Sequence, residues 1–126
     1  METKRQLTTE RRQFKRVKTS TSSMFRVIAP LLVRMQIEDK EVESILHDIS
    51  EGGTAILTNY EIPVDSLLSV NFTLFNDTSI RKESKRIEAE GETRYNLITE
   101  NKEYRIGVKF TNISPKDRNF ISRYTR

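Results

Sequence analysis

The sequence predicts a mainly β fold: a six-stranded antiparallel β-barrel that carries a flexible basic arm at its N-terminus and an α-helix at its C-terminus. Six strand-like stretches follow one another through short turns with no helical segment between them, which is typical of such a barrel. The only helical pattern lies at the end of the chain, and the excess of positive charge lies at its start. The 126 residues, of which 35% are hydrophobic, leave room for one core. We therefore expect an arm and connector over residues 1–23 and a barrel with its helix over residues 24–126.

The N-terminal arm holds the charge excess of the chain. Residues 1–18 contain seven Lys or Arg and two Glu, whereas residues 19–126 contain fifteen basic and sixteen acidic side chains. A basic arm on a near-neutral body is typical of a protein that binds an anionic partner, although a solvated, disordered tail has the same composition. Phe14 within the arm is interpreted as an anchor onto the barrel, and the polar run KTSTSS at residues 18–23 as the connector.

Six strands are expected in the body of the chain. The first is VRMQI at residues 33–37, where apolar and polar side chains alternate until the acidic turn EDKE. Closure of the strands into a barrel would leave no exposed sheet edge. The other five are VESILHDIS at 42–50, TAILTN at 54–59, LLSVNFTLF at 67–75, RIEAEGETRYNLI at 86–98 and EYRIGVKF at 103–110.

The helix is expected within residues 113–126. Ser114 can cap it, Pro115 suits its first position, and Asp117 stands three residues after the cap, as in a capping box. The apolar side chains that follow, from Phe120 on, share one face of a helix. We expect this face to close one end of the barrel; contact with a partner is the alternative.

The sequence offers no catalytic or metal-binding constellation. It contains no cysteine, and alternation places its one histidine, His47, beside Ile45 and Ile49, as a core or boundary residue. Ser50 stands outside any G-x-S-x-G motif and without an evident base. No spacing suggests the three or four ligands of a zinc site. We expect no enzyme activity, no catalytic residue, no metal and no cofactor.

The hydropathy of the chain bears on its location. No apolar run reaches the roughly 18 residues that a membrane span needs, and charged residues stand at the N-terminus where a signal peptide would be apolar. The absence of cysteine agrees with a reducing compartment. We therefore expect a cytoplasmic protein without membrane insertion.

The segment HDISEGG, residues 47–53, forms a polar corner. Asp48 and Ser50 are two residues apart at the end of a strand and project to the same face, and Gly52 and Gly53 follow at once. An acidic acceptor, a hydroxyl and a backbone without side chains allow a planar ligand to approach closely. An ordinary exit from a strand into a turn uses the same residue types.

Two spaced motifs give the chain a resemblance to a known family. Arg12 and Arg16 form an R-x-x-x-R pair on the arm, and Asp48, Ser50 and Gly53 form a D-x-S-x-x-G ahead of the closing strand RIGVKF. This arrangement resembles the PilZ domain, the bacterial receptor module for cyclic di-GMP. The resemblance covers the arm, a six-stranded split barrel and a terminal helix after the GVKF strand, which is almost the whole chain.

The resemblance implies a role for each motif residue. Arg12 and Arg16 would clamp the ligand, because guanidinium groups bind phosphate oxygens bidentately and stack on flat bases. Asp48 would accept hydrogen bonds from the N–H edge of a guanine. Ser50 would bond a phosphate or a base, and Gly53 would leave room for the ring system.

The resemblance also bears on stoichiometry and on further contacts. In this family an extra arginine just before the pair accompanies binding of two stacked ligand molecules, and Arg11 stands there. We therefore expect two cyclic di-GMP molecules per chain. Candidates for additional contacts are Gly52, Arg94, Tyr95, Arg105 and Gly107.

By the same resemblance, the expected function is that of a receptor or adaptor. The arm, mobile while its charges repel one another, would become ordered on bound phosphates. The new surface would regulate an effector protein in motility, in secretion or pilus function, or in exopolysaccharide output. A PilZ-like adaptor that has lost the ligand is disfavoured because both motifs are intact.

The alternative from another class is a small nucleic-acid-binding barrel with the arm on a phosphate backbone. This alternative predicts aromatic platforms on the solvent-facing side of the strands. Instead the strand aromatics fall with the apolar sets and are expected in the core. These residues are Phe72, Tyr95, Tyr104 and Phe110. Nucleic acid is therefore the less favoured ligand.

Overall fold

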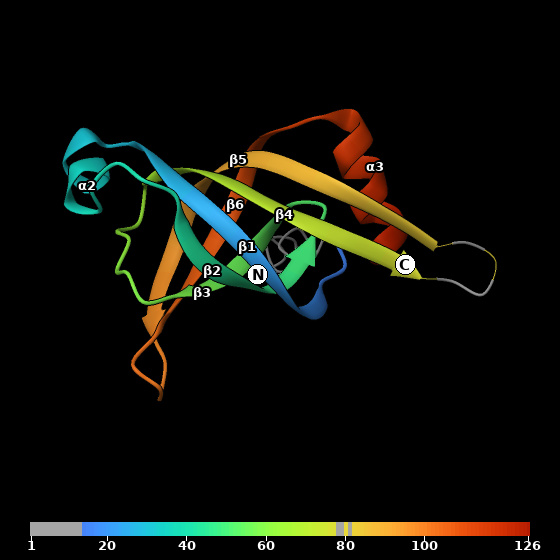
Figure 1. Ribbon diagram of the computed structural model, residues 1–126, viewed down its shortest axis with the longest axis horizontal. Coiled ribbons are helices and arrows are strands. Elements are labelled where there is room, and N and C mark those ends of the chain that lie inside the picture. Colours follow the sequence, from blue (N-terminus) through green and yellow to red (C-terminus); the bar gives the residue numbers. More distant parts are fainter. Residues whose placement is uncertain (1–13, 78–79, 81) are drawn as a thin grey trace, which may run out of the picture.

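The computed structural model describes residues 14–77, 80 and 82–126. Within them the chain forms six strands and two helices (Figure 1). In chain order these are β1 (Val17–Ala29), α2 (Leu31–Gln36), β2 (Val42–Ser50), β3 (Gly53–Thr58), β4 (Leu67–Asp77), β5 (Lys82–Ile98), β6 (Tyr104–Ile113) and α3 (Pro115–Tyr124).

The six strands close into one antiparallel barrel. Around the barrel they follow the order β1–β2–β3–β6–β5–β4, so that β1 pairs with both β2 and β4. Alternate side chains along the strands point inward and form the core, in which residues such as Phe25, Leu46, Ile56 and Ile106 are fully buried. The predicted mainly β fold, a six-stranded antiparallel barrel with a C-terminal helix, is confirmed.

Five of the predicted strands lie where the sequence patterns place them. β2 has the predicted bounds, and β3 begins and ends one residue before its predicted range. The strands β4, β5 and β6 extend two to four residues beyond the predicted ranges at one end. Alternation over long stretches therefore locates the central strands well.

The predicted first strand at residues 33–37 is wrong, because these residues lie in and directly after the short helix α2. Val33 and Ile37 are buried, whereas Met35 between them is 59% exposed. A spacing of four residues places two side chains on one face of a helix, so five alternating residues fit either structure. Pro30 stands immediately before the helix, where a missing N–H costs nothing.

The strand that takes its place is β1, and the connector predicted at residues 18–23 is wrong because it lies inside this strand. Ser23 points inward, and its hydroxyl hydrogen-bonds that of Ser44 on β2 at 2.7 Å. A buried hydroxyl with a partner costs little, so a run of Ser and Thr can serve as a barrel strand. The barrel thus begins at Val17, and the predicted boundary after residue 23 falls within β1.

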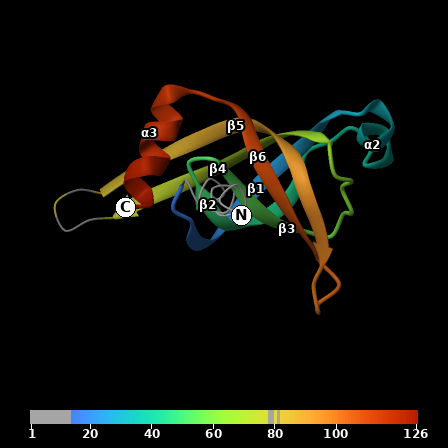
Figure 2. The same ribbon diagram turned by 180° about the vertical axis from the view of Figure 1, so that it is seen from behind.

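The helix α3 packs against one end of the barrel (Figure 2). Ser114 Oγ accepts a hydrogen bond from the backbone N–H of Asp117 at 3.1 Å, as the predicted cap requires. Phe120 and Ile121 are buried in the core cluster. Asp117 is buried as well and pairs with Lys85 Nζ of β5 at 3.1 Å. The predicted packing of this helix on the barrel is confirmed.

Candidate functional site

One row of residues crosses four strands on the outer face of the barrel. Asp48 of β2 pairs with Ala55 of β3, Ala55 pairs with Gly107 of β6, and Gly107 pairs with Tyr95 of β5. Ile106, directly before Gly107, is fully buried in the core. Because successive side chains of a strand point to opposite faces, the row lies on the outside.

Asp48 is the centre of this row. Its side chain is only 9% exposed, and its Oδ1 accepts hydrogen bonds from Arg16 Nη1 at 2.7 Å and from the backbone N–H of Ala55 at 3.1 Å. Its Oδ2 accepts a hydrogen bond from Arg105 Nη2 at 2.8 Å. One nearly buried carboxylate therefore joins Arg16, just before β1, to Arg105 on β6 through charge-assisted hydrogen bonds.

Arg105 is held by three neighbours at once. Besides Asp48, its Nε donates to His47 Nδ1 at 3.2 Å and its Nη1 donates to the Tyr95 hydroxyl at 2.8 Å. The guanidinium also lies over the Tyr95 ring, 5.8 Å from the ring centroid. Each nitrogen of the guanidinium has a partner, so the side chain is fixed in one position.

His47 takes a boundary position and not a core position. It is half-buried, and the pairing of β2 with β3 shifts between Leu46 and Asp48, which makes His47 the extra residue of a bulge. The histidine thereby reaches Arg105 on the outer face. Sequence reasoning did not include His47 in the site; its place directly before the motif aspartate is the signal that could have found it.

Tyr95 lies on the outer face, so its predicted place in the core is wrong. The pairing of β5 with β6 shifts between Thr93, which is fully buried, and Tyr95. The shift breaks the alternation and turns the tyrosine outward. Its ring covers Gly107 so closely that a Cβ at position 107 would overlap it. The bare backbone of Gly107 is what makes room for the aromatic ring.

Ser50 and Gly53 build the turn between β2 and β3. The Ser50 hydroxyl accepts a hydrogen bond from the backbone N–H of Gly52 at 3.2 Å and donates to the carbonyl of Gly53 at 3.3 Å. A Cβ at Gly53 would collide with the backbone carbonyl of Val108 on β6. Ser50 therefore stabilises the turn, and Gly53 allows β3 and β6 to approach each other closely.

Phe14 packs over this turn. A Cβ at Gly52 would lie 2.8 Å from Cδ2 of the Phe14 ring, and Phe14 is half-buried. This contact is the anchor expected of the arm aromatic. It fixes the backbone two residues before Arg16, which brings that arginine to the outer face.

The remaining predicted residues do not join the network. Arg94 is exposed, and its Nη1 lies 3.7 Å from the carboxylate of Glu92. Arg11 and Arg12 lie outside the described residues, as does most of the basic arm, so its expected flexibility stays a prediction.

The charge of the site suits an anion. Arg16 is 54% exposed and Arg105 28%, and both share the single carboxylate of Asp48. A guanidinium carries five N–H donors, and Arg16 donates one of them to Asp48. No other hydrogen bond joins the Arg16 guanidinium to a described residue. The arrangement can therefore hold an anionic ligand and present a flat guanidinium to it.

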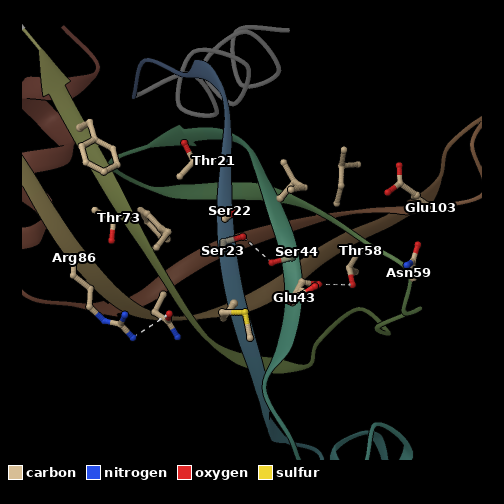
Figure 3. A pocket seen from close by; sticks show the side chains of 16 residues that line it. Thr21, Ser22, Ser23, Glu43, Ser44, Thr58, Asn59, Thr73, Arg86 and Glu103 are labelled. Carbon is tan, nitrogen blue, oxygen red and sulfur yellow. Dashed lines mark hydrogen bonds between the residues drawn. The ribbon is translucent and has the colours of Figure 1, made fainter.

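An open hollow of about 700 Å³ lies on another part of the barrel (Figure 3). Its lining comes mainly from β1, β2, β3 and β4 and includes the carboxylates of Glu43 and Glu103. Arg86 is the one cation of the lining, and its Nη2 already donates to Asn71. None of the predicted site residues lines this hollow, and its carboxylates oppose binding of phosphate.

Two absences concern only the part of the chain that the structure describes. Residues 14–77, 80 and 82–126 contain no group of three or more His, Asp or Glu side chains that could hold a metal ion. Within the same residues no helix has the length and apolar character to cross a bilayer.

Comparison with known proteins identifies a family and several similar folds. A family model described as the PilZ domain matches residues 10–126. The match includes the described part of the arm, all six strands and α3. A search of curated protein sequences gives no significant match.

Three solved structures share the fold. The Bacillus subtilis inhibitor of motility (MotI/DgrA) has a TM-score of 0.71 at 15% identity, over 90% of this chain and 49% of that one. The PilZ domain of YcgR from Escherichia coli, solved with c-di-GMP, has a TM-score of 0.58 at 14% identity, over 91% of this chain and 88% of that one. The Borreliella burgdorferi PlzA protein, in complex with c-di-GMP, has a TM-score of 0.57 at 13% identity, over 98% of this chain and 46% of that one. This chain thus spans about half the length of two of these relatives.

Proposed function

This chain belongs to the PilZ domain family, and on that premise we propose that it is a receptor for cyclic di-GMP that regulates a partner protein and catalyses no reaction. The observation that carries the proposal is the convergence of Arg16 and Arg105 on Asp48. This convergence supports a preformed, positively charged binding site beside the two motifs. The structures of YcgR and PlzA, which contain c-di-GMP, and the name of MotI as an inhibitor of motility support the choice of ligand and an output in motility. The cytoplasmic location and outputs in secretion, pilus function or exopolysaccharide synthesis stay predictions.

In this proposal the arginines bind the phosphates of the ligand. Arg16 is already tethered to the barrel by Asp48 and has free N–H donors on its solvent side. Arg12, four residues before Arg16 in the motif, would reach the ligand from the arm. Because Arg16 is held in place before binding, less side-chain entropy is lost when the ligand arrives.

Besides accepting a hydrogen bond from a guanine, Asp48 positions Arg16 and Arg105. Three hydrogen bonds already reach its two oxygens, and a carboxylate has about four acceptor sites. One position is therefore left for a guanine N–H, while the others keep both arginines in position. We propose that Ser50 and Gly53 act through the shape of the turn that carries Asp48.

Among the additional candidates, Arg105 and Tyr95 are the ones we assign to the site. They are linked to each other and to Asp48, whereas Arg94 pairs with Glu92. Gly107 leaves room for the ring of Tyr95, and Gly52 leaves room for the ring of Phe14. A guanidinium above an aromatic ring offers a flat surface on which a base can stack.

Two further elements complete the proposal. The extra arginine at position 11 favours two stacked ligand molecules per chain. Bound phosphates would order the arm residues before Phe14 against the barrel and create the surface that the effector protein recognises.

The test is calorimetric titration of cyclic di-GMP into the wild type and three variants. Arg16→Ala, Arg105→Ala and Asp48→Ala should each weaken binding by tenfold or more, since one charge-assisted contact contributes about 1.5–3 kcal/mol. Arg86→Ala is the matched control, because Arg86 is exposed on another part of the barrel and pairs with Glu88. Its affinity should equal that of the wild type.

The same titration separates the proposal from its alternatives. Undetectable binding of cyclic di-GMP by the folded wild type would falsify the receptor assignment. A stoichiometry of one would remove the ligand dimer and leave the receptor. Single-stranded RNA is the second titrant, because the outward position of Tyr95 removes one argument against nucleic acid; tighter binding of RNA than of cyclic di-GMP would favour the nucleic-acid-binding barrel.

A further inference from the structure

A second hollow, of about 550 Å³, lies between α3 and β5, and its lining side chains are cations and neutral polar groups, with no Asp or Glu among them. Lys116, Asn119, Arg123 and Arg126 come from or directly follow α3, and Lys85 comes from β5. Ser122 completes the lining. Steps of three and four residues place the contributions of the helix on one of its faces. The hollow is separate from the proposed ligand site, whose residues come from β2, β5 and β6 and the start of β1.

Two of its cations are held in position by the fold. Lys85 Nζ lies 3.1 Å from Oδ1 of the buried Asp117. The Arg123 guanidinium lies 3.6 Å from the carboxylate of Glu83 and 5.4 Å from the ring centroid of Phe120. These contacts fix two long side chains in advance, so that less side-chain entropy is lost when an anion binds.

The other two cations are free to meet a partner. Lys116 and Arg126 are exposed and make no ion pair with any described residue. Four cationic side chains face the hollow; Lys85 pairs with Asp117, and Arg123 pairs with Glu83. The hollow therefore keeps an excess of about two positive charges, which attracts an anionic partner.

We propose that this hollow, the basic face of α3, is a docking surface for an acidic segment of a partner protein. The cations on the helix are spread over about 10 Å, at 1.5 Å per residue from Lys116 to Arg123, and Arg126 follows the end of the helix. Carboxylates on an extended chain, about 6.6 Å apart at every second residue, can reach several of these cations. Asn119 and Ser122 between the cations can bond the peptide groups of such a chain.

The composition of this face argues against the other polyanions. None of the exposed large hydrophobic side chains of the described residues lies on α3, so nothing there can insert into a lipid surface as interfacial helices do. Phe120 is buried, and no aromatic ring of the described residues lines the hollow. A stacking platform for the bases of single-stranded nucleic acid is therefore missing.

The experiment uses a fluorescein-labelled hexaglutamate peptide and the ligand-free full chain. Fluorescence anisotropy should show binding that weakens as salt is raised, since the contact is electrostatic. The double variant Lys116→Glu/Arg126→Glu should weaken binding by about tenfold or more, because it replaces two attractions by two repulsions. Backbone amide shifts on titration with the peptide should include α3 and the neighbourhood of Lys85, and these shifts should be lost in the double variant.

Arg118→Glu is the matched control for the charge change. Arg118 is exposed on α3 but stands roughly 200° around the helix from Lys116, so its reversal should leave affinity within about twofold of the wild type. Equal weakening by Arg118→Glu, or no effect of the double variant, would overturn the proposal. Stronger binding of phosphatidylglycerol vesicles or of an oligothymidylate to this face would overturn it in favour of a lipid or a nucleic acid.

Discussion

Gly107 is the residue that allows Tyr95 to lie on the outer face of the barrel. A Cβ at position 107 would overlap the tyrosine ring. The hydroxyl of that ring accepts a hydrogen bond from Arg105 Nη1 at 2.8 Å, and Arg105 also donates to Asp48. The absence of one side chain therefore supports the position of a guanidinium in the proposed ligand site.

Gly107→Ala should destabilise the protein by about 1–3 kcal/mol, because the added methyl displaces the Tyr95 ring. In a Tyr95→Ala background the same substitution should cost only a few tenths of a kcal/mol, since the ring is gone. Urea unfolding of the wild type, both single variants and the double variant measures the difference. An equal cost in both backgrounds would mean that something other than Tyr95 excludes a side chain at this position.

The residues of the site differ in how far the sequence could predict them. The resemblance of the two motifs to the PilZ domain singled out Arg16 and Asp48, and the structure brings their side chains together at 2.7 Å. The outward turn of Tyr95 depends on a register shift between β5 and β6. Such a shift is a property of two paired strands, so no alternation pattern within one strand could reveal it.

Asp39, in the turn after α2, forms ion pairs with two arginines, Arg34 of α2 and Arg26 of β1. It has a positive φ of 48° and accepts hydrogen bonds from Arg34 Nε at 2.8 Å and from Arg26 Nη1 at 3.3 Å. The hydrogen bonds from Arg34, followed by the charges of Arg34 and Arg26, lower the pKa of Asp39 against the effect of desolvation. The turn is thereby tied to both α2 and β1.

The pH dependence of this turn follows from the direction of the shift. A carboxyl whose pKa is lower in the folded state than its unfolded value of about 3.9 stabilises the fold above that value, and this contribution is lost as the pH falls through the folded pKa. The titration midpoint of the Asp39 carboxyl, measured by NMR, should lie below 3.9 on the reference scale. In Arg34→Gln it should rise toward that value. Lys40→Gln, which removes a partner of Glu38, should leave it unchanged.

The helix α2 and a strand at the same residues would give different effects of substitution at Val33 and Met35. In a strand Val33 and Met35 would share a face and an environment, whereas in α2 Val33 is 6% exposed and Met35 59%. Val33→Ala should therefore destabilise the protein by about 1–2.5 kcal/mol. Met35→Ala should change stability by no more than about 0.5 kcal/mol. Thermal unfolding of the two variants decides between the structures, and equal losses would favour the strand.

The elements show where local sequence patterns are sufficient. The ranges of β4, β5 and β6 each hold long alternation, and the cap and the apolar face of α3 are specific to helices. The five residues 33–37 are too few to separate a period of two from a spacing of four. The hydroxyl-rich half of β1 has no apolar alternation that could predict a strand. Its inward Ser23 is satisfied by the Ser44 hydroxyl of β2, a partner that only the folded sheet supplies.

At the scale of the whole molecule, one barrel core supports two charged surfaces of different composition. The ligand site places two guanidinium groups around a nearly buried carboxylate on the outer face. The basic face of α3 presents four cations and two neutral polar groups beside the end of the barrel. Since the two surfaces share no residue, substitutions on one should act independently of those on the other.

This independence can be measured through the stability of the whole protein. Cyclic di-GMP at about 100 times its dissociation constant should raise the free energy of unfolding by about 2.7 kcal/mol for each bound molecule, because it binds only the folded state. Asp48→Asn should lose most of this gain, since the amide cannot hold both arginines by charge. The α3 variant Lys116→Glu/Arg126→Glu should keep the full gain. If it loses the gain in urea unfolding with ligand, the helix and the ligand site are coupled through the barrel, and the partner surface on α3 is under direct control of the ligand.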